Sequence, residues 1–104
     1  MATPIRRHGG WMEDRYTELC EQLMDRLQPG FGGQSRPDFV AAVAAMTREI
    51  ESLGNDGYIH EKAAGVRECV GIACSARRYR PWGLRRVEEF AYADAYHLVG
   101  ARTA

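Results

Sequence analysis

The sequence predicts an all-α fold, a compact four-helix bundle-like single domain with short loops. Apolar residues recur in steps of three and four along four separate segments, which is the spacing of one helix face. Glycine, proline and asparagine cluster between these segments, where they end helices and turn the chain. No segment alternates apolar and polar residues for long enough to predict a strand.

The first segment, residues 11–27, carries an apolar stripe on one side and acidic residues on the other. The stripe consists of Met12, Tyr16, Leu19, Leu23 and Leu27, with Trp11, Cys20 and Met24 beside it. The acidic residues are Glu13, Asp14, Glu18, Glu21 and Asp25. Pro29 and Gly30 end the predicted helix, because proline cannot continue its hydrogen-bond ladder.

The second segment begins near Ser35 and runs to Leu53. Ser35 followed by Asp38 resembles a capping box, and Pro37 suits a first helical turn. Its apolar seam consists of Phe39, Val43, Met46, Ile50 and Leu53. In the glycine-rich connection before this segment, we expect Phe31 to fold back over the core, since an exposed phenylalanine would be unfavourable.

The third segment, residues 58–79, is rich in small residues, so we expect it to be the central helix with neighbours close on more than one side. Gly65 and Gly71 each cost roughly 1 kcal/mol of helix propensity relative to alanine, so packing must hold this helix. Its seam consists of Ile59, Ala63, Val66, Val70 and Ala73.

The fourth segment, residues 84–99, follows a helix break at residues 80–83 and has a broad apolar face. That face consists of Leu84, Val87, Phe90, Ala91, Ala95 and Leu98, widened by Tyr92, Tyr96 and Val99. Gly100 suits the C′ position directly after a helix. Asp94 has two interpretations: a flank residue that reaches solvent, or a buried acid paired with an arginine or a tyrosine hydroxyl.

Length and composition predict one helical domain over residues 11–100, with a flexible N-terminal arm at 1–10 and a short tail at 101–104. The chain has 104 residues, and 45% are hydrophobic, which is ordinary for a globular protein. No apolar run approaches the roughly 20 residues that cross a bilayer, so we expect no membrane partner. Three cysteines, an odd number, argue against a disulfide framework and favour a cytoplasmic setting.

No catalytic or cofactor motif is present, so we expect no enzyme activity and no cofactor. The available soft metal ligands are His60, Cys69, Cys74 and His97. Cys69 and Cys74 point in different directions on a helix, and their spacing is not that of a zinc pair, so we expect no metal site. An enzyme would need a site assembled across helices from the histidines, Tyr92, Tyr96 and a cysteine.

The strongest candidate surface is the arginine corner, where the third segment meets the fourth. It consists of Arg77, Arg78, Tyr79, Arg80, Trp82, Arg85 and Arg86. Exposed arginine and tryptophan are favoured anchors of protein interfaces, and arginine with aromatic rings also suits nucleic acids. The alternative is a solvated corner with Trp82 folded into the core.

The formal net charge of zero favours a protein partner over nucleic acid. We therefore expect a small binding protein that acts stoichiometrically as an inhibitor, adaptor or regulator. By analogy with other small helical proteins, it could be an anti-defence protein of a phage or mobile element. The alternative is a small nucleic-acid-binding regulator that uses the arginine corner. A homodimer that sets the acidic first helix against the arginine corner of a second copy is a further hypothesis.

Overall fold

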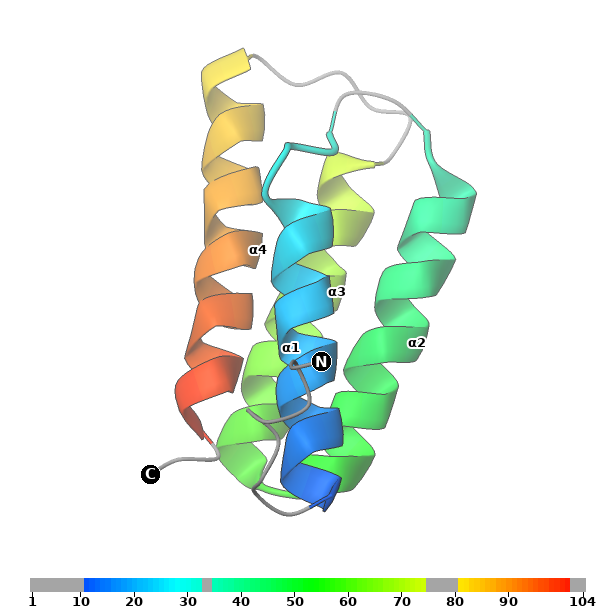
Figure 1. Ribbon diagram of the computed structural model, residues 1–104. Helices are drawn as coiled ribbons and strands as arrows, with labels where there is room; N and C mark the ends of the chain where they lie inside the picture. Colours follow the sequence, from blue (N-terminus) through cyan, green and yellow to red (C-terminus); the bar gives the residue numbers. More distant parts are fainter. Residues whose placement is uncertain (1–10, 33–34, 75–80, 102–104) are drawn as a thin grey trace, which may run out of the picture.

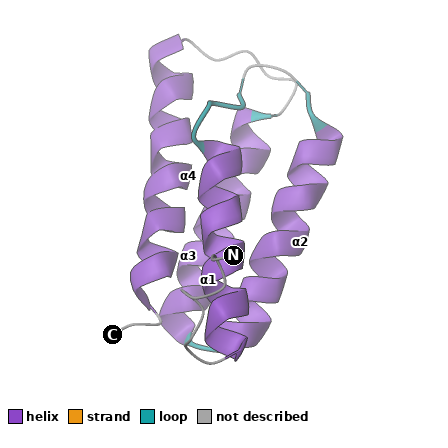
Figure 2. Cartoon of the chain, in the orientation of Figure 1, coloured by secondary structure: helices purple, strands orange, loops and turns teal. Residues whose placement is uncertain are grey.

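The computed structural model describes residues 11–32, 35–74 and 81–101, and the side chains of residues 11–14 and 81–82 lie outside this description. Over these ranges the chain forms four α-helices and no strand: α1 (Trp11–Leu27), α2 (Pro37–Gly54), α3 (Gly57–Ala73) and α4 (Pro81–Ala101) (Figure 2). Consecutive helices run antiparallel, up and down the long axis of the molecule (Figure 1). The prediction of an all-α four-helix bundle is confirmed.

Each helix occupies one corner of the bundle and packs against two neighbours. Helix α1 contacts α2 and α4, and α3 contacts the same two helices from the opposite corner. The prediction that the third helix has close neighbours on more than one side is confirmed, although α3 occupies a corner of the bundle like the other three helices. Its small residues allow close approach to α4, and these two form the most extensive helix pair in the structure.

The apolar stripes of all four helices meet in one core. The buried hydrophobic residues are Tyr16, Leu19, Cys20, Leu23, Leu27, Phe31, Phe39, Val43, Ile50, Ile59, Ala63, Val66, Val70, Ala73, Cys74, Ala91, Ala95 and Leu98. Phe31 is only 3% exposed and its ring stacks on that of Phe39, which confirms that it folds back over the core. Burying one large apolar side chain contributes roughly 1.5–3 kcal/mol, so these stripes dominate the stability of the fold.

The N-terminal cap of α2 differs from the predicted one. Helix α2 has Arg36 at its N-cap, and no side chain caps it, so the predicted capping box is wrong. Because Pro37 already takes the first helical position, Ser35 lies one residue too early to reach the first turn. Helix α3 is capped instead by Asp56, whose carboxylate accepts the backbone N–H of Tyr58 at 3.1 Å.

Helix α4 is longer than predicted at both ends. It begins at Pro81 instead of Leu84 because proline needs no hydrogen-bond partner in a first turn. It continues through Gly100 to Ala101, so Gly100 is not the C′ residue. Helix α3 ends at Ala73, and the rest of the predicted third segment, residues 75–79, lies outside the described residues.

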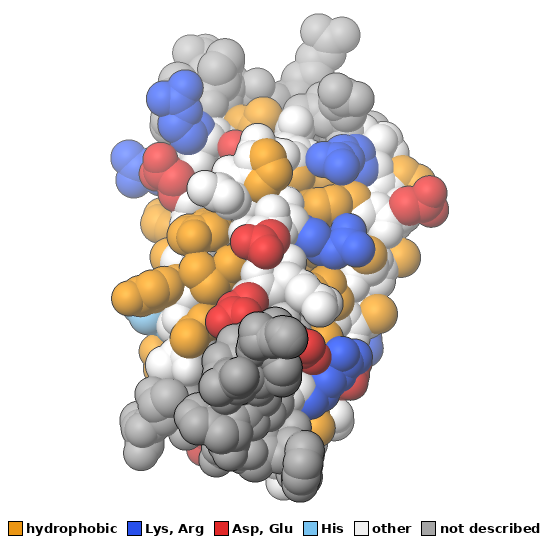
Figure 3. Space-filling view, in the orientation of Figure 1, with side chains coloured by type: hydrophobic (Ala, Val, Ile, Leu, Met, Phe, Trp, Pro, Cys, Tyr) orange, Lys and Arg blue, Asp and Glu red, His pale blue; other side chains and the backbone are white. Residues whose placement is uncertain are grey.

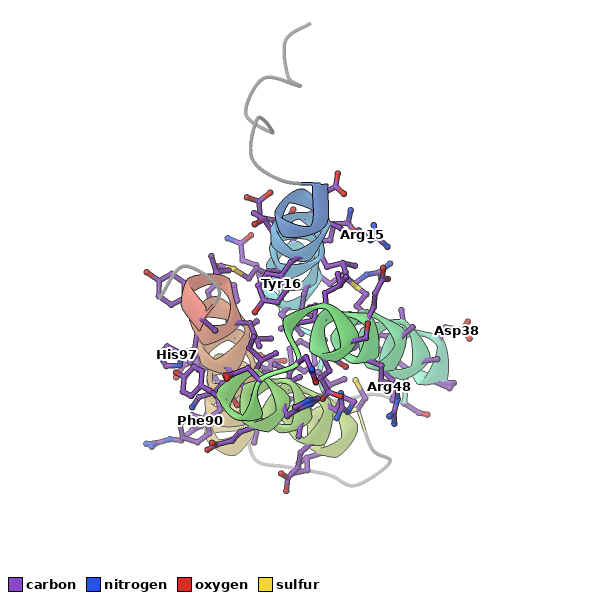
Figure 4. All side chains as sticks on the ribbon, turned by 90° about the horizontal axis from the view of Figure 1, so that it is seen from below. Arg15, Tyr16, Asp38, Arg48, Phe90 and His97 are labelled. Atoms are coloured by element: carbon purple, nitrogen blue, oxygen red, sulfur yellow. The ribbon has the colours of Figure 1, made fainter. Side chains whose placement is uncertain are left out.

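Polar contacts link each pair of neighbouring helices at their margins. Tyr16 donates its hydroxyl to the carbonyl of Leu98 at 2.6 Å and so joins α1 to α4 (Figure 4). The guanidinium of Arg15 binds both carboxylate oxygens of Glu49 on α2, with Nε–Oε2 and Nη2–Oε1 distances of 2.8 and 2.9 Å. The hydrogen bond of Tyr16 is buried between the helices, whereas the Arg15–Glu49 pair is exposed and contributes little to stability.

A second set of contacts joins α3 to its neighbours. Arg67 donates to the buried hydroxyl of Thr47 at 3.0 Å and pairs with Glu51 at 2.8 Å, which links α3 to α2. Lys62 pairs with Asp94 at 3.7 Å, which links α3 to α4. The Asp94 side chain is 24% exposed, which fits the interpretation as a flank residue that reaches solvent, and the partner that the structure shows for it is Lys62.

Gly65 makes room for this last contact. A Cβ atom at position 65 would collide with the Asp94 carboxylate, whereas a Cβ at position 71 would meet nothing. The glycine at position 65 therefore leaves room for the Asp94 carboxylate, whereas the glycine at position 71 has no such packing role in the described structure.

We predict that Gly65→Ala and Gly71→Ala have different effects on the free energy of unfolding. Gly71→Ala should raise it by up to about 1 kcal/mol through helix propensity. Gly65→Ala should give no gain or a loss, because the Asp94 carboxylate must turn away from Lys62. Urea unfolding followed by circular dichroism measures both, and equal stabilisation by the two variants would contradict this packing role.

Candidate interaction surface

The described part of the arginine corner is exposed at the start of α4. Arg85 and Arg86 both lie at the surface. The remaining predicted residues, Arg77, Arg78, Tyr79 and Arg80, lie outside the described residues, as does the side chain of Trp82. The structure therefore shows two of the predicted arginines at the surface, and the placement of the other residues of the corner stays a prediction.

The exposed surface continues from these arginines along α4, on its outward face. This face consists of Arg85, Arg86, Glu89, Phe90, Ala93, Tyr96, His97 and Gly100, all of which are exposed. Phe90 and His97 lie on the outer side of α4, whereas Tyr16 lies between the helices (Figure 4). In Figure 3 the side of the molecule formed by α4 carries basic side chains near its upper end and hydrophobic side chains below them.

Two predicted core residues belong to this outward face. Phe90 is 54% exposed and Tyr96 is 61% exposed, so their assignment to the core is wrong. The buried residues of α4 are Ala91, Ala95 and Leu98, which turn Phe90 and Tyr96 away from the interior. The small side chains of Ala91 and Ala95 leave space for α3 and α1 to approach, so the helix fills the core with few large residues. The sequence alone could not separate the two faces, because apolar residues occur on both.

The start of α4 is held in place by the side chain of Glu88. Its Oε2 atom accepts the backbone N–H groups of Phe31 at 3.0 Å and Gly32 at 2.7 Å, in the connection between α1 and α2. Gly30 turns this connection with a φ of 87°, a left-handed conformation that favours glycine. No local pattern could predict this contact, because Glu88 lies 57 and 56 positions from Phe31 and Gly32 in the sequence.

The same connection is fixed to α3 by a thiol. Cys74 donates its Sγ–H to the carbonyl of Phe31 at a distance of 3.4 Å. The backbone of Phe31 is thus bonded from both sides, by Glu88 of α4 and by Cys74 of α3. These two hydrogen bonds hold the α1–α2 connection at the end of the bundle where α4 begins, close to Arg85 and Arg86.

Two surface pockets border the outward face of α4. One, of about 440 Å³, lies between the end of α1 and α4 and is lined by Leu27, Gln28, Gly30, Arg85, Glu88, Glu89, Tyr92 and Ala93. The other, of about 670 Å³, lies where α3 begins and α4 ends, and is lined by Asp56, Tyr58, Tyr96, His97, Val99, Gly100 and Ala101. Both mix apolar and polar groups, which suits contact with a second macromolecule.

Cys69 and Cys74 are free thiols, and both have a raised pKa. Burial raises the pKa of Cys69, and the nearby carboxylates of Asp94 and Glu68 add to this. Burial also raises the pKa of Cys74, against the opposing effect of Arg36. A raised pKa leaves less of the nucleophilic thiolate at neutral pH.

The candidate metal ligands are dispersed in the described part of the chain. His60 lies beside Glu51 at 3.6 Å, and Cys69 and Cys74 contribute to no cluster. Over the described ranges, no three His, Cys, Asp or Glu side chains are grouped so that they could hold a metal ion. No helix among these residues has the length and apolar character to span a membrane.

Comparisons with protein-family models, with curated proteins and with solved structures find no match for this chain.

We predict that Glu88→Ala lowers the free energy of unfolding by about 1–2 kcal/mol, because two backbone N–H groups lose their acceptor. Hydrogen exchange at the amides of Phe31 and Gly32 should accelerate in the same variant. Glu89→Ala is the matched control, since Glu89 is the exposed neighbour on the same helix. Unchanged exchange at both amides in Glu88→Ala would show that the carboxylate does not hold the connection.

Proposed function

We propose that this chain is a non-enzymatic binding protein that acts stoichiometrically on a protein partner, as an inhibitor, adaptor or regulator. The contact is made by the arginine corner together with the adjoining part of the outward face of α4. One observation carries the proposal: Phe90 is more than half exposed, one turn beyond the exposed Arg85 and Arg86 on the same helix.

The chemistry of this surface defines the kind of partner that fits it. Large exposed apolar side chains beside arginine are enriched at the centres of protein interfaces, where burial of the ring supplies affinity. Guanidinium groups bind carboxylates with two parallel hydrogen bonds, which adds specificity. A complementary partner carries carboxylates opposite Arg85 and Arg86 and an apolar recess that receives Phe90.

The polar groups inside the bundle support binding over catalysis. Arg67 is engaged with Thr47 and Glu51, and Lys62 is engaged with Asp94, so these groups join helices to one another. The raised pKa values of Cys69 and Cys74 also disfavour a cysteine nucleophile.

We predict that the double variant Arg85→Glu/Arg86→Glu weakens capture of the partner by roughly 10-fold to 100-fold, because two favourable ion pairs become repulsive. Capture of proteins from the native host, quantified against the wild type, measures the effect. The circular dichroism spectrum should stay unchanged, since both side chains are exposed.

The matched control is Arg26→Glu/Arg48→Glu, which reverses two exposed arginines on α1 and α2. It makes the same change in net charge away from the proposed surface. Equal loss of capture in both double variants would contradict the assignment of the surface. Duplex DNA binding that weakens steeply with added salt, in place of protein capture, would favour the nucleic-acid alternative.

A further inference from the structure

Exposed residues lie at equal distances on either side of Ala93 along the outward face of α4, which is the spacing of any one helix face. Ala93 is exposed at the middle of this face, and its small side chain allows another helix to approach closely. Phe90 lies three residues before Ala93, and Tyr96 lies three residues after it. Glu89 and His97 lie four residues before and after the same point.

The same relation continues to the ends of the helix. Arg86 lies seven residues before Ala93, and Gly100 lies seven residues after it. Arg86 is therefore near the N-terminal end of α4, and Gly100 is in its last turn, where the backbone carbonyls give the helix a partial negative charge. The described last turn contains no basic side chain.

We propose that the outward face of α4 binds a second copy of this chain, with the two α4 helices antiparallel and a two-fold axis passing beside Ala93. In this arrangement, residues at equal distances before and after Ala93 face each other across the axis. The contact is isologous, because both copies use the same surface.

Each pairing in this register is favourable. Phe90 packs against Tyr96 of the second copy, which buries the two large exposed hydrophobic side chains that the structure describes on α4 in each copy. Glu89 faces His97 of the second copy, so a carboxylate meets an imidazole ring whose N–H can donate a hydrogen bond to it. Arg86 faces the last turn of the other α4, where a cation is favoured.

A parallel arrangement of the two helices would lose these pairings. It would set Arg86 beside Arg86 and Glu89 beside Glu89 of the second copy, and like charges would repel. The order of charges along α4, basic first and then acidic, aromatic and histidine, therefore selects the antiparallel dimer. This dimer differs from one in which acidic α1 meets the arginine corner, because it does not use α1.

The contact involves one helix from each copy, which is at the small end of interface sizes. We expect a dissociation constant on the order of 10 μM, typical of a weak interface. The dimer and the proposed complex both use Phe90 and Arg86, so a copy that is bound to the protein partner cannot dimerise through this face at the same time.

The test is sedimentation equilibrium of the full chain from low micromolar to near-millimolar concentration. We expect a monomer–dimer equilibrium for the wild type. Ala93→Glu should weaken it by at least about tenfold, because two carboxylates would meet at the axis. Ala41→Glu is the matched control, since it adds the same charge at an exposed alanine on α2 and should leave the dimer intact.

A second variant reports on the register directly. Ala93→Cys should form an intermolecular disulfide on mild oxidation, because the two residues lie beside the axis, and Ala64→Cys on the exposed side of α3 should not. A wild-type chain that stays monomeric at all concentrations overturns the inference. So does a dimer that survives Ala93→Glu or is lost only in Arg85→Glu/Arg86→Glu. A monomeric Ala93→Glu variant that still captures the partner would separate this dimer from the proposed function.

Discussion

The rotation of α4 about its own axis is the constraint on which the surface of this protein depends. Three contacts set it. The small side chains of Ala91 and Ala95 are buried, the Asp94 carboxylate fits over Gly65 and pairs with Lys62, and Glu88 accepts two backbone N–H groups from the α1–α2 connection. With these residues turned inward, Phe90 and Tyr96 have no place in the core. The exposure of Phe90 and Tyr96 is thus a consequence of how α4 packs against its neighbours.

The α1–α2 connection acts as a joint between three helices. The ring of Phe31 stacks on that of Phe39 of α2. Its N–H donates a hydrogen bond to Glu88 of α4, and its carbonyl accepts one from the thiol of Cys74, directly after α3. One residue outside any helix therefore makes contacts with three of them. This arrangement stabilises the end of the bundle where α4 begins. Arg85 and Arg86, which lie on the first turns of α4, are therefore part of a well-held region.

Helical periodicity was sufficient to predict the four helices and most of the core. Tyr16, Val43, Val66 and Leu98 were each assigned to an apolar stripe and are buried, since steps of three and four determine a face whatever the partner. Periodicity could not predict Thr47, a buried polar residue whose hydroxyl is satisfied by the carbonyl of Val43 and by Arg67. Such a position depends on a partner that is distant in the sequence.

The candidate surface was predictable in part for the same reason. A run of arginines around a helix break indicated an exposed corner, and Arg85 and Arg86 are exposed. Their extension along α4 was not predicted, because Phe90 and Tyr96 continue the apolar spacing and only the packing against α3 shows which way they point. The contact of Glu88 with Phe31 joins residues far apart in the chain, and no local pattern could have indicated it.

The close fit between Gly65 and Asp94 also limits how this sequence can change over time. A side chain added at position 65 would require the Asp94 carboxylate to turn away from Lys62 or position 94 to become smaller. Related chains should therefore vary at these two positions together, whereas Gly71 should drift independently. Paired substitution of this kind would identify distant homologues of the fold whose overall resemblance has been lost.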